Sequence, residues 1–343
     1  MNGILSKKKF LVGVVFIITL TILLIRDNIN NHVTIYMLNY VPQHLTTDEF
    51  EKLFQMKTVK LKIGETQLSY DMTVPYDTNE CDNVEMVVYV MTMVDNYSFR
   101  RRQNIREIIS KTTNRTVLFR FFLGRSEDMN LQTIVPEIMA FKDIVYYTHN
   151  ETYRENYVKW YSMHDYHMTY CPNVKYFVKM DDDVTADYGR VFSWIDEGFN
   201  GLIGNKSEYF LCHGMYNFWP IRNKHSRWYI PIEEFSENRW PDYCFGYFIL
   251  TTNDTIKTIT KAMRNVNLVH MDDCFITGIV RRETTVPLLN WSGICSNPNE
   301  IDYTKCSKDN TIPWPIALHN TKTKSLVEKW LNTMHDIKCP LLE

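Results

Sequence analysis

The chain has 343 residues, of which 45% are hydrophobic, 14% aromatic and 23% charged. Aromatic residues run through almost its whole length, which excludes an intrinsically disordered chain and indicates a folded globular protein. A formal net charge of -2 excludes the strongly basic surface typical of nucleic-acid-binding proteins.

The N-terminus carries three lysines at positions 7–9, followed by an apolar run at 10–25. A cleaved signal peptide and an uncleaved signal anchor both fit this pattern, and the lack of a small-residue cleavage site favours the anchor. The run is short for a membrane span of about 17–25 residues, but flanking residues and a thin bilayer tolerate such a length. The positive-inside rule predicts that residues 1–9 form a cytosolic tail and that the rest of the chain is lumenal.

Two further features agree with a lumenal, secretory location. All eight cysteines lie after the predicted anchor, and their even number in an oxidising compartment predicts disulfides whose pairing stays open. Asn-x-Ser/Thr sequons, the acceptors of N-linked glycans, begin at Asn96, Asn114, Asn150, Asn205, Asn253 and Asn290.

Residues 26–80 are mixed and polar without a sustained period, and we interpret them as a stem that leads to a globular domain at 81–343. Apolar runs of strand length then occupy 84–94, 116–124, 143–147 and 174–180. Helical segments lie between them at 100–110, 126–141 and 152–170, and Pro136 is expected to break or kink the second. This alternation predicts an α/β fold with a mainly parallel sheet, which binds its ligands beyond the carboxyl ends of the strands.

Three consecutive aspartates follow the strand at 174–180 directly. Side chains two apart face the same way along a strand, so Asp181 and Asp183 could present two carboxylates to one point. Such hard oxygen ligands suit Mg²⁺ or Mn²⁺, which keep open positions for phosphate oxygens. The competing interpretation is a solvated acidic turn.

A second acidic pair, Asp272 and Asp273, precedes a helical segment, FITGIV. Simple capping of a helix N-terminus would explain it. The alternative is a general base that takes a proton from an attacking hydroxyl group.

Basic and imidazole side chains supply further candidates. Arg100, Arg101, Arg102 and Arg106 open a helix after the first strand, where they could bind a diphosphate or form a solvated basic face. His319 could be a neutral metal ligand, although a lone histidine is more often packed or capping.

Taken together, these motifs resemble the β-1,3-glycosyltransferase family, which contains β-1,3-galactosyltransferases, β-1,3-N-acetylglucosaminyltransferases and, more remotely, Fringe. The similar segments are RRQNIR at 101–106, RFFLG at 120–124, KMDDDV at 179–184, WPDYCFG at 240–246 and MDDCFITG at 271–278. The resemblance covers almost the whole predicted lumenal domain.

The resemblance implies a nucleotide-sugar-binding domain of the GT-A type in a single-pass Golgi membrane protein. It implies Mn²⁺ (or Mg²⁺) as cofactor, a UDP-sugar donor, a glycan, glycoprotein or glycolipid acceptor, and an inverted β-1,3 linkage, with galactose favoured. The motifs assign the metal to Asp181, Asp183 and His319 and the base to Asp272 and above all Asp273. The resemblance assigns nucleotide binding to Arg102, Arg106, Lys179 and Asp182.

The chain also departs from the family pattern. Ile108 and Ile109 replace Thr-Trp, Lys142 replaces a glycine, and Phe248 with Ile249 replaces Gly-Tyr, which is expected to narrow a pocket. These departures leave open a non-catalytic member that acts as a lumenal chaperone or glycan-binding protein. A calcium-binding adhesion domain is a third, less complete explanation.

Overall fold

A computed structural model describes residues 46–126 and 131–339. The predicted cytosolic tail and membrane anchor lie outside the described residues. Within 46–126 and 131–339, no helix is both long and apolar enough to cross a membrane.

The centre of the fold is a nine-stranded sheet with the order β1-β2-β5-β4-β3-β6-β9-β8-β10. Its four middle strands are β5 (Ile144–Asn150), β4 (Val117–Arg125), β3 (Met86–Met91) and β6 (Tyr176–Asp181). They pair in parallel and coincide with the four predicted strands. All six residues of β3 are buried, as expected for a parallel strand covered on both faces.

The prediction of a mainly parallel sheet is wrong for the flanking strands, so the sheet is mixed. These are β1 (Met56–Ile63), β2 (Thr66–Thr73), β9 (Tyr243–Thr252), β8 (Phe210–Met215) and β10 (Leu288–Asn290). The pairs β1-β2, β2-β5, β6-β9 and β8-β9 are antiparallel, and only β8-β10 is parallel among the flanking pairs of the described chain. Antiparallel neighbours need no crossover helix, and therefore the alternation of strands and helices in the sequence does not reveal them.

Strands β1 and β2 form a hairpin from residues that sequence analysis assigned to the stem. Val59, Leu61 and Ile63 are buried, whereas Lys60 and Lys62 between them are exposed. This alternation with a period of two is the signature of a half-buried strand, so the hairpin is part of the folded sheet.

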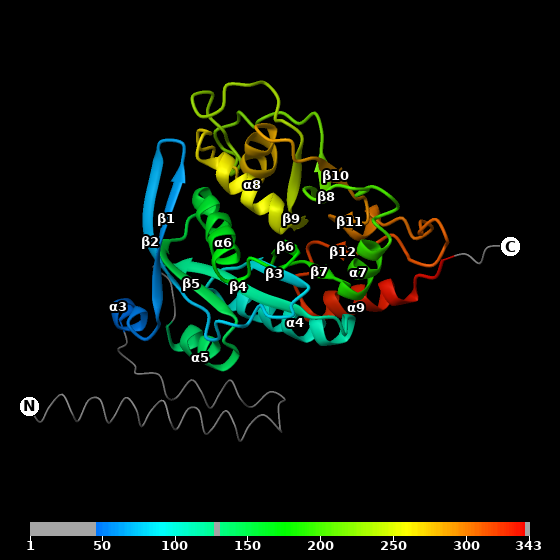
Figure 1. The fold of residues 1–343 in the computed structure, drawn as a ribbon, viewed down its shortest axis with the longest axis horizontal. Coiled ribbons are helices and arrows are strands. Elements are labelled where there is room, and N and C mark those ends of the chain that lie inside the picture. The colour runs from blue at the N-terminus through cyan, green and yellow to red at the C-terminus, as the bar shows by residue number, and fades with distance from the viewer. Residues whose placement is uncertain (1–45, 127–130, 340–343) are drawn as a thin grey trace, which may run out of the picture. The chain divides into compact units, whose positions relative to one another are not determined.

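Helices cover both faces of the sheet (Figure 1). One face carries α6 (Asn156–Tyr170) and α8 (Asn253–Met263), whose apolar side chains pack with those of the strands in one large core. The other face carries α4 (Asn96–Thr112) and α7 (Tyr188–Asp196), and α9 (Lys324–Asp336) packs beside α4. Helix α4 begins before the predicted residue 100 because the Asp95 side chain caps it by accepting a hydrogen bond from the backbone N–H of Ser98.

Helices α3 (Thr47–Glu51) and α5 (Leu131–Phe141) belong to a separate small unit. Of the two expected effects of Pro136, a break does not occur, because α5 continues through it. Lys142, which directly follows α5, adopts a left-handed backbone conformation with φ of 55°. Glycine adopts this conformation at a lower steric cost than lysine does.

The structure pairs six of the eight cysteines. The disulfides are Cys81–Cys171, Cys212–Cys244 and Cys306–Cys339. Cys274 and Cys295 are buried free thiols. Disulfides were predicted, but their pairing depends on which strands and loops the fold brings together.

Candidate active site

The three aspartates lie at the carboxyl end of β6, in the middle of the sheet. Asp181 is the last residue of β6, and a turn leads to the short strand β7 (Thr185–Ala186). Strand β7 belongs to a second sheet with the order β11-β12-β7, formed with β11 (Ile294–Cys295) and β12 (Ala317–Leu318). The predicted location of the acidic motif, beyond the end of a parallel strand, is therefore confirmed.

The pairing of β7 with β12 brings His319 to the aspartates across 136 positions of sequence. Leu318 lies opposite Thr185 in this antiparallel pair. Three residues after Leu318, the backbone N–H of Thr321 donates a 2.8 Å hydrogen bond to the carbonyl oxygen of Asp183. As a result, Nε2 of His319 lies 3.1 Å from Oδ1 of Asp183.

Asp181, Asp183 and His319 form a donor set that could hold a divalent ion. One ligand atom of each residue lies within 4.8 Å of those of the other two. Two carboxylate oxygens and an imidazole nitrogen are a ligand combination that Mn²⁺ accepts. The Asp181 side chain is 37% exposed, so the set is open to solvent on one side. The residues present therefore fit the ion that the sequence motif implies.

His319 is held in place by an aromatic neighbour that sequence analysis did not identify. The rings of Tyr247 and His319 are stacked, with centroids 4.6 Å apart and planes 3° from parallel. The Tyr247 hydroxyl in turn lies 2.7 Å from Nδ1 of His213. Burial alone would raise the pKa of Asp183, but the hydrogen bond and charge of His319, with Arg101, outweigh it and lower that pKa. Asp183 is therefore ionised, as a metal ligand must be.

Asp182 points away from this donor set and fixes the turn. It accepts hydrogen bonds from the Thr92 hydroxyl at 2.8 Å and from Arg101 at 2.9 Å. Burial raises its pKa, while the contacts with Arg101 and Thr92 oppose that shift. Lys159, which is also buried, donates to the carbonyl oxygen of Thr92 and forms an ion pair with Glu151.

The two arginines assigned to the nucleotide make contacts within the protein. Arg102 is 1% exposed and donates to the Thr92 hydroxyl and to the carbonyl oxygen of Met93. Arg106 forms a two-pronged ion pair with Asp143, with both N–O distances 2.7 Å. Arg101, from the same basic turn, contacts the acidic motif through its ion pair with Asp182.

Lys179 links the first acidic cluster to the second. Its ammonium group lies 2.6 Å from Oδ1 of Asp181, donates to the carbonyl oxygen of Gly246 and sits 5.3 Å over the ring of Trp160. Burial would lower its pKa, but the charges of Asp181, Asp273 and Asp272 outweigh this effect and raise it. The lysine is therefore charged and stabilises carboxylates on both sides.

Asp272 and Asp273 begin a helical segment whose central part, η2 (Cys274–Val280), is a π-helix. The predicted place at a helix start is confirmed, and π-helical turns are frequent at functional sites. The indole N–H of Trp160 donates a 3.0 Å hydrogen bond to Asp272, and the backbone N–H of Gly246 donates a 2.9 Å bond to Asp273. These partners hold both carboxylates beside Lys179.

The pKa of Asp273 is raised well above its usual range. Desolvation is the main cause, the neighbouring Asp272 adds to it, and Lys179 opposes it. The pKa of Asp272 is also raised, again mainly by desolvation. A carboxylate with a raised pKa is a stronger base, which is the property that proton abstraction from a hydroxyl group requires.

Phe248 does not line an open pocket. It is completely buried in β9, opposite Met180 of β6, and the neighbouring Ile249 is part of the large core. The Phe248 side chain thus packs inside the fold, and its effect on a substrate pocket stays a prediction.

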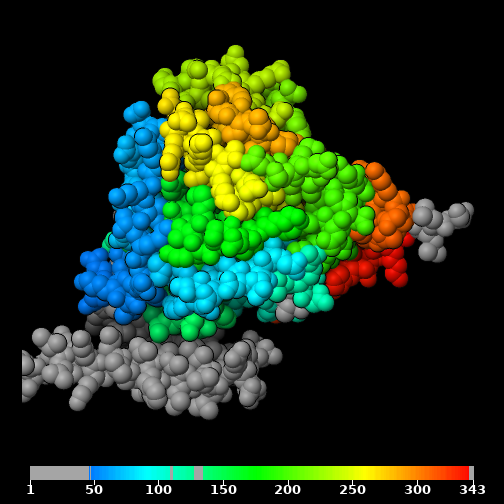
Figure 2. All heavy atoms as spheres, in the orientation of Figure 1, coloured from blue at the N-terminus to red at the C-terminus, as the bar shows by residue number. Residues whose placement is uncertain are grey.

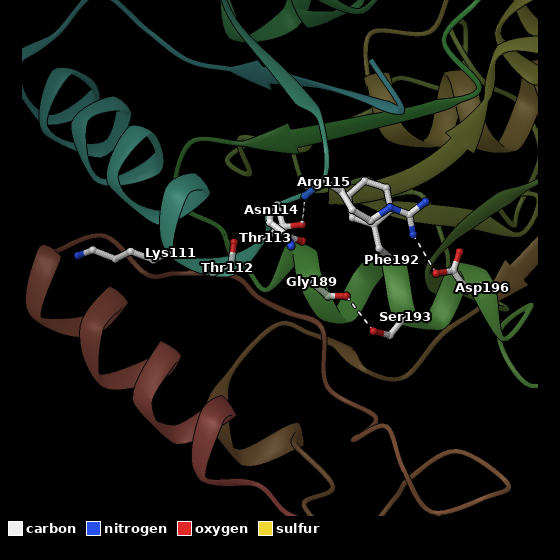
Figure 3. Close-up of a pocket in the computed structure, with 9 residues that line it drawn as sticks. All are labelled: Lys111, Thr112, Thr113, Asn114, Arg115, Gly189, Phe192, Ser193 and Asp196. Atoms are coloured by element: carbon white, nitrogen blue, oxygen red, sulfur yellow. Dashed lines mark hydrogen bonds and ion pairs between the residues drawn. The ribbon is translucent and has the colours of Figure 1, made fainter. Parts of the chain in front are cut away.

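A cavity of about 500 Å³ lies at a different place, between the end of α4 and α7 (Figure 3). Its lining includes Asn114, Arg115, Phe192 and Asp196, and Arg115 forms an ion pair with Asp196. None of the acidic motif residues lines it, so the cavity is separate from the candidate active site.

Comparisons with known proteins agree with these motifs. A family model described as Galactosyltransferase matches residues 100–291. Human β-1,3-galactosyltransferase 2 is 24% identical over 213 residues, which cover 61% of this chain and 49% of the relative. Mouse lactosylceramide 1,3-N-acetyl-β-D-glucosaminyltransferase is 20% identical over 328 residues, which cover 90% of this chain and 81% of the relative.

The chain thus spans about half the length of the β-1,3-galactosyltransferase 2 relatives that it matches. Among solved structures, a glycosyltransferase involved in glycosylation of the major capsid of PBCV-1 is similar with a TM-score of 0.35. It is 9% identical, and the match covers 72% of this chain and 98% of that protein.

Proposed function

The chain belongs to the galactosyltransferase family, and from that premise we propose that it transfers a sugar from a UDP-sugar to a hydroxyl group of a glycan acceptor. The sugar is a hexose or N-acetylhexosamine, with galactose as the first candidate, and the linkage is β-1,3 with inversion at the anomeric carbon. One observation supports this proposal most: the buried Lys179 interacts with two carboxylate clusters. One has the donors for a metal ion, and the pKa values of the other are raised, as suits a base.

The residues of the first cluster hold the donor. Asp181, Asp183 and His319 would hold Mn²⁺ or Mg²⁺, and the ion would neutralise negative charge on the diphosphate. Asp182 and Arg102 keep the turn in shape through Thr92. Lys179 stabilises the ionised form of Asp181 and adds positive charge near the site.

The second cluster acts on the acceptor. Asp273 takes the proton from the acceptor hydroxyl as its oxygen bonds to the anomeric carbon. The bond from that carbon to UDP breaks on the opposite face, so UDP leaves and the configuration inverts. Trp160 and Gly246 act as positioning residues, because their N–H groups orient Asp272 and Asp273.

The test is a UDP-release assay on the full chain from a eukaryotic host. UDP-galactose, UDP-N-acetylglucosamine and UDP-N-acetylgalactosamine are offered with β-galactoside or N-acetylhexosamine acceptors and Mn²⁺. We expect acceptor-dependent release that disappears with a chelator and in Asp183→Asn. A folded chain that binds UDP in a metal-dependent way yet releases none from any combination would favour the non-catalytic alternative.

We also propose the cellular context that the sequence implies: a GT-A-type domain in the Golgi lumen, after a stem and a single anchor at 10–25. Microscopy of the tagged full chain and protease protection of the lumenal side test this arrangement. Sensitivity of residues 81–343 to protease in intact vesicles would contradict it.

A further inference from the structure

The long loop between β8 and β9 exposes several aromatic side chains. We call residues 216–242 the aromatic loop; it is the yellow-green segment at the top of Figures 1 and 2. Trp219 is 64% exposed and Trp228 is 45% exposed, and Tyr216 and Phe218 are exposed as well. Single exposed apolar residues are ordinary, but a group of exposed aromatic rings on one loop points to a ligand.

Two of the exposed rings in this region are joined into a platform. The indole N–H of Trp228 donates a 2.9 Å hydrogen bond to the hydroxyl of Tyr153, which is itself 43% exposed. The guanidinium of Arg227 lies 4.4 Å from the centre of the Tyr153 ring and 5.2 Å from that of Trp228. We call Tyr153, Arg227 and Trp228 the aromatic platform.

The aromatic loop is held by several internal contacts despite its length. Arg222 donates to the carbonyl oxygens of Ile230 and Phe235 at 2.8 Å and 2.6 Å. Phe235 is stacked on Trp240 with centroids 4.3 Å apart, and both are buried. A rigid loop presents its rings at little cost in conformational entropy, which favours binding.

Two connections tie the platform to the proposed base. Glu234 of the aromatic loop lies 2.7 Å from Nδ1 of His270, two residues before Asp272. Tyr153 lies in η1 (Tyr153–Glu155), directly before α6, and Trp160 of α6 donates to Asp272. Tyr153 and Trp160 are seven positions apart, in η1 and in the first turns of the adjoining helix α6.

Several charged side chains near the platform already have partners within the protein. Glu234 accepts from His270, and Glu237 forms an ion pair with Arg282 at 2.9 Å. Arg227 lies over aromatic rings, and Arg239 donates to Asn217. An uncharged ligand with a flat apolar face therefore fits this surface better than an acidic peptide, and a pyranose ring has such a face in its C–H groups.

We propose that the aromatic platform binds a sugar ring of the glycan acceptor, next to the sugar whose hydroxyl group reacts at Asp273. This inference rests on the proposed function and names the site that holds its acceptor. The Tyr153 and Trp228 rings stack on the apolar face of the sugar, and Arg227 fixes the two rings.

Direct binding tests this proposal without turnover. Lactose, N-acetyllactosamine and N-acetylglucosamine are titrated into the full chain by calorimetry, and the Trp228→Ala and Tyr153→Ala variants are compared with Trp219→Ala. Trp219 is the matched control because it is exposed on the same loop but outside the platform. We expect the first two variants to weaken binding of at least one sugar roughly three- to tenfold, the loss typical of one aromatic contact, and the control to bind normally.

The outcomes separate this proposal from the proposed function. Normal sugar binding by Trp228→Ala, an equal loss in Trp219→Ala, or no binding of any of the three sugars to the wild type would overturn the platform. If the platform variants bind sugar more weakly but the wild type releases no UDP, the platform is supported and the proposed transferase activity is refuted. If the wild type releases UDP and Trp228→Ala keeps the wild-type KM for the acceptor, the transferase activity is supported and the platform is refuted.

Discussion

The backbone N–H of Gly246 donates a 2.9 Å hydrogen bond to Oδ2 of Asp273, and no side chain fits between the two residues. A Cβ atom built on Gly246 would lie 1.9 Å from Oδ1 of Asp273. The glycine in the WPDYCFG motif thus gives the proposed base its position.

Gly246→Ala should therefore displace Asp273 and lower the transfer rate about 100-fold, the usual effect of a catalytic group misplaced by about 1 Å. The measurement is kcat for UDP release, with UDP affinity and thermal unfolding measured beside it. Gly214→Ala is the matched control, because its Cβ would meet only the ends of the flexible Tyr216 and Leu288 side chains. A Gly246→Ala protein with full activity would contradict the placement of the base.

Asp273→Asn should remove proton abstraction and lower kcat by about 10²–10⁴-fold, while UDP binding stays normal. Asp272→Asn, which keeps an acceptor for the Trp160 indole N–H, should have a smaller effect. Steady-state kinetics of both variants give the answer. A larger loss of kcat in Asp272→Asn than in Asp273→Asn would indicate that Asp272 is the base.

The raised pKa of Asp273 predicts how stability depends on pH. Because the folded state keeps this proton to a higher pH than the unfolded state, the resulting stabilisation is present at acid pH and is lost as pH rises through the raised pKa. Asparagine does not ionise, so Asp273→Asn should melt at a higher temperature than the wild type at neutral pH. Thermal unfolding across pH checks this, and a difference that does not shrink toward pH 4 would argue against it.

Removal of the metal donors should abolish ion dependence. Asp183→Asn removes the negative charge of one of the three ligand groups that lie within 4.8 Å of one another, and His319→Ala removes the ligand atom of another. Each should therefore weaken Mn²⁺ binding at least tenfold. Calorimetric titration of Mn²⁺ into the full chain measures this. Asp196→Asn, which changes an exposed carboxylate paired with Arg115, should bind Mn²⁺ like the wild type. Equal affinities in all variants would place the ion elsewhere.

Arg106 was assigned to the nucleotide from sequence, and its ion pair with Asp143 predicts a structural effect. Arg106→Ala leaves a largely buried carboxylate without this partner and should lower the free energy of unfolding by about 2–4 kcal/mol. Chemical denaturation measures the change, and Arg115→Ala, at a more exposed ion pair, is the control. A raised KM for the UDP-sugar with unchanged stability would instead support the role in nucleotide binding.

Much of the fold could be predicted because it depends on local patterns. The buried runs that form β3, β4, β5 and β6 are continuous in sequence, and their parallel pairing follows from the helices between them. The hairpin of β1 and β2 also has a local signal, because apolar and polar residues alternate in KTVKLKI at 57–63. The interpretation of this region as a stem did not take that alternation into account.

The sequence by itself determined the chemical types at the site: carboxylates at the end of one strand, a second pair at a helix start, and a late histidine. Only the tertiary structure decided which of these groups meet. The β7-β12 pairing brings His319 to Asp183, and burial places Lys179 between the two acidic clusters. Trp160 and Tyr247 gain their roles in the same way, because a hydrogen bond or a ring contact between distant segments has no periodicity in the sequence and exists only once the chain has folded.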